Sequence, residues 1–181
     1  MTSPSSTEGG PVRLEDYIRN IPDFPVPGIQ FKDISPLLSD RRAFPEAIRR
    51  MADPFRDTGV ITVAGIESRG FLFASAIALE LDAGVVMLRK PGKLPYTTIS
   101  QHYALEYGKD AVEAHEDAVT PGDRVLLVDD LIATGGTLQA GMELIRKLGA
   151  DLVGVSLLIE LTELEGMKVV GEVPCSVIMR L

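Results

Sequence analysis

The sequence contains no tryptophan, and aromatic residues make up only 6% of its 181 residues. Cysteine is nearly absent too, because Cys175 is the only one. A single cysteine forms neither an intrachain disulfide nor a cysteine metal cluster, and this scarcity is typical of proteins in a reducing compartment. We therefore expect a mainly aliphatic core and a cytoplasmic location.

Positive charge is also scarce, since 18 Lys and Arg stand against 26 Asp and Glu and give a net charge of −8. This balance argues against a broad basic face for nucleic acid, although a local anion site remains possible. His102 and His115 do not have the spacing of a zinc motif. We expect small-molecule ligands and no nucleic-acid partner.

Long apolar runs are lacking as well. The longest, residues 71–88, is interrupted by Glu80 and Asp82, so we expect no membrane-spanning helix and no membrane partner. The first residues have neither the basic nor the apolar region of a signal peptide. Residues 1–11 are instead expected to form a disordered tail.

What the sequence does contain is an alternation of short apolar runs and helical patterns. The predicted strands are 60–66, 84–89, 125–130, 152–161 and 174–181, and the predicted helices are 13–20, 44–55, 71–81 and 137–149. Residues 21–28 are rich in proline and are predicted to be irregular. Apolar strands that alternate with helices indicate an α/β fold with a parallel sheet buried on both faces.

The alternation fails between residues 90 and 124, where the sequence is polar and rich in tyrosine. We expect a hairpin that leaves the compact domain there. Long excursions of this kind are usually functional lids, and a plain surface hairpin is the alternative.

The stretch 125–137 reads V-L-L-V-D-D-L-I-A-T-G-G-T. Its two carboxylates, Asp129 and Asp130, follow a buried strand, and ligands of parallel α/β sheets bind beyond such strand ends. A helix N-cap and a solvated charge would explain one aspartate, but not two in this position. We expect the pair to bind hydroxyl groups or a cation.

The following A-T-G-G-T opens a helix, whose free backbone N–H groups form an anion site. Gly135 and Gly136 allow close approach of the anion, and Thr134 and Thr137 add hydroxyl donors. The sequence lacks G-x-G-x-x-G, and Gly65 to Gly70 continues without the lysine of a P-loop. These features predict a phosphorylated sugar as ligand rather than an NTP or a dinucleotide.

The same stretch resembles the phosphoribosyl-diphosphate signature of type I phosphoribosyltransferases. Four further stretches are similar, in order and spacing, to the adenine phosphoribosyltransferase family: F-P-x-P-G-I-x-F-K-D-I-S-P (24–36), G-I-E-S-R-G-F-L-F (65–73), R-K-P-G-K-L-P (89–95) and L-E-Y-G-K-D (105–110). The resemblance covers residues 14–181. It implies the parallel-sheet type I phosphoribosyltransferase fold, with a base-binding N-terminal hood at 12–36, a core at 37–181 and a flexible hairpin lid at about 93–118.

The implied reaction converts adenine and phosphoribosyl diphosphate to AMP and pyrophosphate in purine salvage. The resemblance implies Mg²⁺ as cofactor, held mainly through the substrate's diphosphate and ribose hydroxyls, with no strong protein ligand. It also implies a homodimer. A same-fold enzyme for guanine, xanthine or orotate is one alternative. A non-catalytic sensor of phosphoribosyl diphosphate is another, although such regulators normally add a DNA-binding domain.

The resemblance also implies residue roles. Asp129 and Asp130 would bind the ribose hydroxyls. The 5′-phosphate would be bound by Ala133, Thr134, Gly135, Gly136 and Thr137. The diphosphate would be bound by Ser68, Arg69, Arg89, Lys90, Lys93, Ser100 and Tyr103. A non-proline cis peptide bond, typical of the family's diphosphate loop, would fall at Glu67–Ser68.

Glu106 matches the family's proposed general acid/base for the adenine N9 proton. Pyrophosphate itself is the alternative proton acceptor, which would leave Glu106 as an exposed hairpin residue. Adenine would stack between Phe31 and Leu131, with backbone groups of Gln30 and Lys32 at its edge. Lys32 departs from the arginine that is frequent at its position.

Overall fold

A computed structural model of the chain describes residues 10–105 and 108–181. Internal contacts divide the chain into two compact units, residues 1–47 and residues 48–181. The boundary falls within helix α2 (Ala43–Ala52). No helix in the described part of the chain is long and apolar enough to span a membrane.

The first unit contains a small antiparallel hairpin. A single 3-10 turn, η1 (Leu14–Tyr17), precedes strand β1 (Arg19–Pro22), which pairs with β2 (Gln30–Asp33). Helix α1 (Ser35–Ser39) follows. The predicted helix over 13–20 is therefore wrong beyond its first turn, and Ile21–Pro22 are not irregular. Proline cannot donate to a ladder from its nitrogen, but it is tolerated in an edge strand such as β1.

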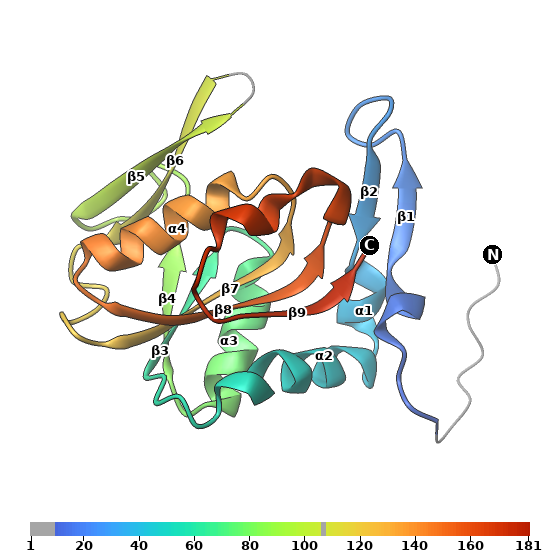
Figure 1. Ribbon diagram of the computed structural model, residues 1–181, viewed down its shortest axis with the longest axis horizontal. Coiled ribbons are helices and arrows are strands. Elements are labelled where there is room, and N and C mark those ends of the chain that lie inside the picture. Colours follow the sequence, from blue (N-terminus) through green and yellow to red (C-terminus); the bar gives the residue numbers. More distant parts are fainter. Residues whose placement is uncertain (1–9, 106–107) are drawn as a thin grey trace. The chain divides into compact units, whose positions relative to one another are not determined.

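The second unit is built on a five-stranded parallel sheet, which confirms the predicted fold class (Figure 1). Its strands, in the spatial order β4-β3-β7-β8-β9, are β4 (Gly84–Leu88), β3 (Thr62–Ile66), β7 (Arg124–Ile132), β8 (Asp151–Glu160) and β9 (Cys175–Arg180). All five correspond to apolar runs in the sequence. Their buried residues are almost entirely aliphatic, as the composition predicts.

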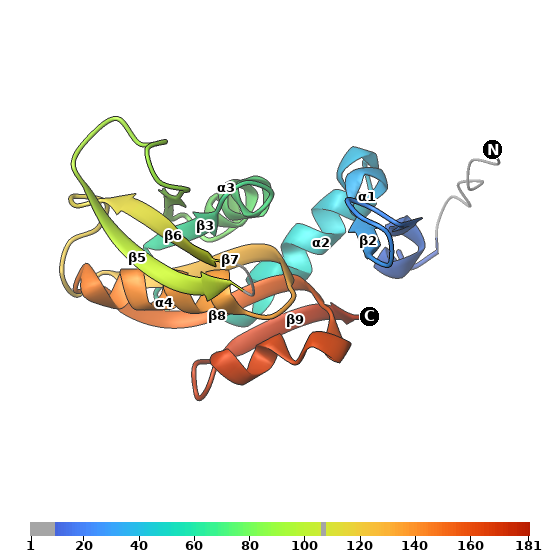
Figure 2. The ribbon, with the colours of Figure 1, turned by 90° about the horizontal axis from the view of Figure 1, so that it is seen from above.

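Helices cover both faces of this sheet. Helix α3 (Gly70–Glu80) lies on one face and α4 (Gly136–Lys147) on the other (Figure 2). Glycine permits the close approach on the α3 side, since a Cβ at Gly65 would lie 2.7 Å from the Cβ of Ala74. Because α3 follows β3 and α4 follows β7, both helices begin at the carboxyl edge of the sheet. That edge therefore collects two helix N-termini.

Short 3-10 turns complete the second unit. They are η2 (Asp53–Phe55), η3 (Thr162–Leu164) and η4 (Gly166–Val169). Gly149 adopts φ +83 just beyond α4, in the left-handed conformation expected after a helix end.

The excursion after β4 is a hairpin, as predicted. Strands β5 (Thr98–Leu105) and β6 (Gly108–His115) pair antiparallel. The hairpin lies against α4, where Gln101 Nε2 donates to Glu143 Oε2 at 2.7 Å and Lys147 Nζ donates to the Ser100 carbonyl at 2.9 Å. The buried side chains of Val112 and Ala114 join the apolar core on the α4 side of the sheet.

Candidate active site

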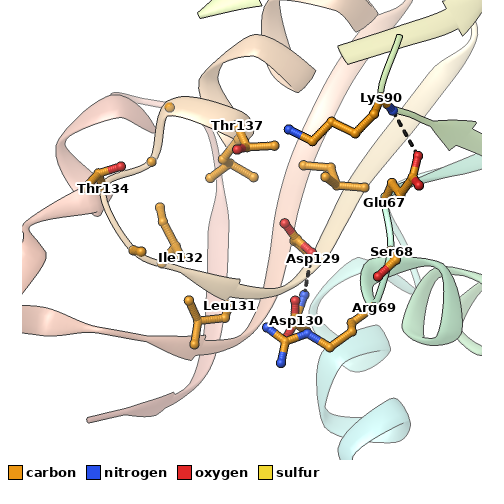
Figure 3. A pocket seen from close by; sticks show the side chains of 15 residues that line it. Glu67, Ser68, Arg69, Lys90, Asp129, Asp130, Leu131, Ile132, Thr134 and Thr137 are labelled. Carbon is orange, nitrogen blue, oxygen red and sulfur yellow. Dashed lines mark hydrogen bonds and ion pairs between the residues drawn. The ribbon is translucent and has the colours of Figure 1, made fainter. Parts of the chain in front are cut away.

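A pocket of about 340 Å³ opens at the carboxyl ends of β3, β4 and β7 (Figure 3). Three separate parts of the chain line it: residues 66–69 after β3, Lys90 after β4, and residues 129–138 from the end of β7 into α4. This is the edge at which ligands of parallel α/β sheets bind. Residues 129–137 of the 125–137 stretch line this pocket, and their binding of a phosphorylated sugar stays a prediction.

The two aspartates lie side by side at the end of β7. Asp129 Oδ1 accepts a hydrogen bond from the Asp130 backbone N–H at 2.8 Å. Asp130 is only 5% exposed, and its Oδ2 lies 2.9 Å from Arg69 Nη2. One carboxylate of the pair is therefore balanced by a cation from the neighbouring loop.

Burial, followed by the charge of Asp130, raises the pKa of the Asp129 carboxyl well above its usual range. Burial also raises the pKa of Asp130, against the opposing effect of Arg69. A carboxylate in this position favours partners that donate hydrogen bonds or bring positive charge. Sugar hydroxyls and a cation are both such partners.

The loop between β7 and α4 is shaped by close backbone packing. Gly135 has φ +86, and a Cβ there would lie 2.7 Å from the Gly166 carbonyl oxygen. A Cβ at Gly166 would lie 2.2 Å from the Ala133 carbonyl oxygen. The loop leads into the first turn of α4, whose N–H groups have no partners within the helix. All five residues predicted to bind a phosphate, 133–137, line the pocket.

The loop after β3 faces the aspartates. The Glu67–Ser68 peptide bond is cis, as the resemblance implies. Ser68 and Arg69 line the pocket, and so does Glu67, whose role the sequence did not suggest. The Glu67 carboxylate accepts from the Lys90 backbone N–H at 2.9 Å and pairs with Arg89 Nε at 3.2 Å. Burial opposes ionisation of Glu67, but these partners outweigh it and lower its pKa.

The residues predicted to bind a diphosphate divide into two groups. Ser68, Arg69 and Lys90 line the pocket, whereas Arg89, Lys93, Ser100 and Tyr103 are not among its lining residues. Tyr103 contacts a lining residue of the pocket, because its Oη accepts a hydrogen bond from Lys90 Nζ at 2.6 Å.

The remaining three residues of that group are directed elsewhere. Arg89 Nη1 donates to the Lys93 carbonyl at 3.0 Å, and its guanidinium lies 5.9 Å from the Phe71 ring centroid. The Ser100 hydroxyl donates to Glu113 Oε1 at 3.1 Å. The side chain of Lys93 is exposed.

The residues predicted to bind adenine come from both units. Leu131 lines the pocket. Gln30, Phe31 and Lys32 belong to the first unit, where Phe31 meets Phe24 edge-on at 5.1 Å and Lys32 Nζ donates to Asn20 Oδ1 at 2.8 Å. Their contact with a base stays a prediction. Glu106 lies outside the described residues.

Known proteins match this chain along most of its length. A model of the phosphoribosyl transferase domain matches residues 38–175. An adenine phosphoribosyltransferase of Dinoroseobacter shibae is 53% identical over 164 residues, which cover 91% of this chain and 92% of the relative.

Solved structures agree. The adenine phosphoribosyltransferase of Rhodothermus marinus has a TM-score of 0.89 at 49% identity and covers 93% of this chain and 96% of its own. That of Saccharomyces cerevisiae, crystallised with adenine and an imino-altritol bisphosphate, has a TM-score of 0.86 at 35% identity, covering 92% of this chain and 96% of its own. With this coverage and identity, the chain belongs to the adenine phosphoribosyltransferase family.

Proposed function

We propose that this chain transfers the 5-phosphoribosyl group from phosphoribosyl diphosphate to adenine, giving AMP and pyrophosphate in purine salvage. The observation that carries the proposal is one pocket holding both the Asp129-Asp130 pair and the glycine loop that opens α4. The first suits ribose hydroxyls and the second suits a 5′-phosphate. The named activity of the relatives supports the choice of adenine as acceptor.

In this proposal the sugar phosphate is gripped by a single stretch of chain. The 5′-phosphate would accept hydrogen bonds from the backbone of residues 133–137 and from the hydroxyls of Thr134 and Thr137. The ribose hydroxyls would donate to Asp129 and Asp130. Burial raises the pKa of both carboxyls, which means that the ionised form of each is poorly stabilised by its surroundings. A hydroxyl that donates a hydrogen bond to such a carboxylate therefore stabilises it strongly.

The leaving diphosphate would face Arg69 and Lys90, with the cis loop at Ser68 beside it. Displacement at the anomeric carbon has an oxocarbenium-like transition state, in which charge builds on the leaving oxygen. Fixed cations at that oxygen stabilise the transition state. Four further residues that do not line the pocket would also contribute to binding the diphosphate: Arg89, Lys93, Ser100 and Tyr103.

The residues present suit a Mg²⁺ ion that is held mainly by substrate. No group of three or more metal-ligating His, Cys, Asp or Glu side chains occurs in residues 10–105 and 108–181. Arg69 balances Asp130, so Asp129 is the pocket carboxylate left to favour a nearby cation. When bound, Mg²⁺ would offset the charge of the diphosphate and its leaving oxygen.

Selection of adenine would rest on backbone groups of Gln30 and Lys32, with stacking on Phe31 and Leu131. A backbone carbonyl accepts from a 6-amino group but opposes a 6-oxo group. Sites built on such a pairing reject the analogue strongly. The yeast relative is known in complex with adenine, which supports this choice of base.

One assay decides the proposal. The protein is mixed with phosphoribosyl diphosphate, Mg²⁺ and each of adenine, guanine, hypoxanthine, xanthine and orotate, and pyrophosphate release is measured. We expect turnover with adenine and little with the others. Turnover with another base would indicate a different same-fold enzyme. Tight binding of phosphoribosyl diphosphate without any turnover would instead indicate the sensor.

Glu106 is proposed as the general acid/base for the adenine N9 proton. We expect Glu106→Gln to lower kcat by about 10²-fold or more, the usual range for a positioned proton-transfer group. The KM for phosphoribosyl diphosphate should change little. A kcat within about threefold of wild type, below one kcal/mol on the transition-state scale, would assign the proton to pyrophosphate instead.

The family resemblance also suggests a cytoplasmic homodimer, and one surface supports the dimer. Five large apolar side chains are exposed on or next to β3, α3 and β4, three elements that contact one another: Ile61, Leu72, Leu79, Val85 and Met87. Alternation along β3 and β4 turns Ile61, Val85 and Met87 to the face that α3 covers. Exposed patches of this kind commonly mark association surfaces.

A further inference from the structure

Lys90 reaches the pocket from the connection after β4, and its amine is held by the hairpin. Lys90 Nζ lies 2.6 Å from Tyr103 Oη and forms an ion pair with Asp110 Oδ2. Tyr103 Oη and Asp110 Oδ2 are themselves 3.0 Å apart. In Figure 3 the Lys90 side chain extends across the pocket, with its amine turned toward Thr137. The three polar atoms form a closed triangle beside the pocket.

The hairpin side of this triangle is itself fixed. Tyr103 and Asp110 are directly opposite partners in the β5–β6 ladder, so they present one face together. The other carboxylate oxygen of Asp110, Oδ1, accepts a hydrogen bond from the Ala111 N–H at 2.8 Å. The Lys90 backbone is held by Glu67. Lys90 is therefore restrained at both its backbone and its amine.

The charges agree with this geometry. Burial disfavours the charged amine, but hydrogen bonding to Asp110 and Tyr103 outweighs it and raises the Lys90 pKa. The hydrogen bond from Lys90 is the largest effect lowering the Asp110 pKa. Both groups are ionised at neutral pH. An ammonium has three N–H donors, and Asp110 and Tyr103 accept two of them, which leaves one for a ligand.

We propose that Asp110, with Tyr103, is a positioning residue that holds the Lys90 ammonium in place for the diphosphate of the sugar substrate. The inference rests on the proposed function, because it takes that diphosphate as the ligand of Lys90. A long, flexible lysine that is ordered before the ligand arrives loses less entropy on binding it. The hairpin thus takes part in substrate binding through a side chain of its described strands, apart from Glu106.

A competing role for Asp110 makes the opposite forecast. If Asp110 merely occupied Lys90 until the diphosphate displaced it, removing the carboxylate would strengthen substrate binding. The structure favours positioning, because Lys90 lines the pocket while it is still bound to Asp110 and Tyr103. No rotation away from the hairpin is needed to present the amine.

The test is a double-mutant cycle in Asp110→Ala, Lys90→Gln and the double variant. Direct binding of pyrophosphate and of phosphoribosyl diphosphate is measured by calorimetry, alongside KM for each substrate. We expect Asp110→Ala to weaken both ligands by about five- to tenfold, within the usual coupling of contacting residues. The KM for adenine should stay within about twofold. In the Lys90→Gln background, Asp110→Ala should have almost no further effect.

Three results would overturn the proposal: tighter diphosphate binding by Asp110→Ala, unchanged binding, or an equal effect with and without Lys90. Asp117→Ala, at an exposed aspartate in the turn after β6, is the matched control and should bind as wild type does. Asp110→Asn keeps the shape of the side chain and repeats the cycle if the alanine variant does not fold. Because binding is read directly, a protein that binds diphosphates but does not convert adenine would refute the proposed function while the cycle still judges Asp110.

Discussion

The carboxyl of Asp129 lies in a place where burial and a second carboxylate both oppose its ionisation. Its pKa in the folded protein lies well above the value expected in the unfolded chain. A raised carboxyl pKa means that ionisation destabilises the fold at any pH above that value. The cost begins to shrink as pH falls below the folded pKa, and it is gone only below the unfolded pKa, where both states hold the proton.

We therefore predict that Asp129→Asn stabilises the ligand-free protein at pH 7, by roughly 1–3 kcal/mol. The gain over wild type should shrink as pH is lowered toward the unfolded pKa, below which the wild-type carboxyl is neutral in both the folded and the unfolded state. The same variant should lose about ten- to a hundredfold in kcat/KM, because it gives up charge-assisted hydrogen bonds to ribose. Thermal unfolding across pH and steady-state kinetics check both parts.

The control for this prediction is Asp57→Asn, at an exposed turn residue. It should change stability little at either pH. Equal stability of wild type and Asp129→Asn at pH 7 would contradict the inference that ionisation of Asp129 is disfavoured in the folded protein. The Asp129 carboxyl therefore lowers the stability of the fold while it serves substrate binding, a trade-off that is common at binding sites.

At this scale the sequence predicts which residues meet but not how each side chain is turned. Asp129 and Asp130 were predictable from their place after a buried strand. That Asp130 pairs with Arg69, or that Arg89 turns to Glu67 and not into the pocket, depends on rotamers chosen by packing. Asp110 was overlooked because its partner Lys90 is twenty residues away and meets it only when the hairpin folds.

At the scale of elements, the turn between β7 and α4 is constrained by close backbone contact. Gly135 combines φ +86 with a carbonyl oxygen 2.7 Å from where a Cβ would lie. Gly122 has nearly the same φ, +89, but nothing lies within 4 Å of its Cβ position. The two glycines separate the cost of the conformation from the cost of the contact.

We predict that Gly122→Ala loses about 1–2 kcal/mol of unfolding free energy, the usual cost of a left-handed residue with a side chain. Gly135→Ala should lose about 1–3 kcal/mol more, because the backbone of η4 must also move. Chemical denaturation gives both values. Equal losses in the two variants would mean that the loop yields easily, contrary to the packing seen around Gly166.

Element prediction succeeded where burial produces a simple pattern. The five parallel strands are buried on both faces and appear as continuous apolar runs, so their ends were found to within a few residues. The β1–β2 hairpin was missed because R-N-I-P and Q-F-K-D are short strands that contain no buried residue and no clear alternation. The pairing of these strands depends on the turn that joins them, and the prolines in that turn predict irregular structure instead of a hairpin.

For the whole molecule, the apolar surface near β4 and α3 predicts association. Leu79 of α3 is 83% exposed, and Leu72 of α3 and Met87 of β4 are exposed as well. We predict that the wild type sediments as a dimer at micromolar concentration and that Leu79→Glu with Met87→Glu shifts it to monomer. Leu164→Glu, at an exposed leucine in η3, should leave the dimer intact. A wild-type monomer would refute the prediction.

The pocket is made from residues 66–69, Lys90 and 129–138, which the parallel sheet joins across long stretches of sequence. Strand β3 pairs with β7, so Thr62 aligns with Val125, and no local hairpin can bring them together. Contacts of such high sequence separation form late and slowly during folding. A partly folded chain would therefore have no substrate site. The rate at which substrate binding returns during refolding would then report the rate at which folding is completed. Substrate present during refolding should stabilise only the finished structure, by mass action, and leave earlier intermediates unaffected.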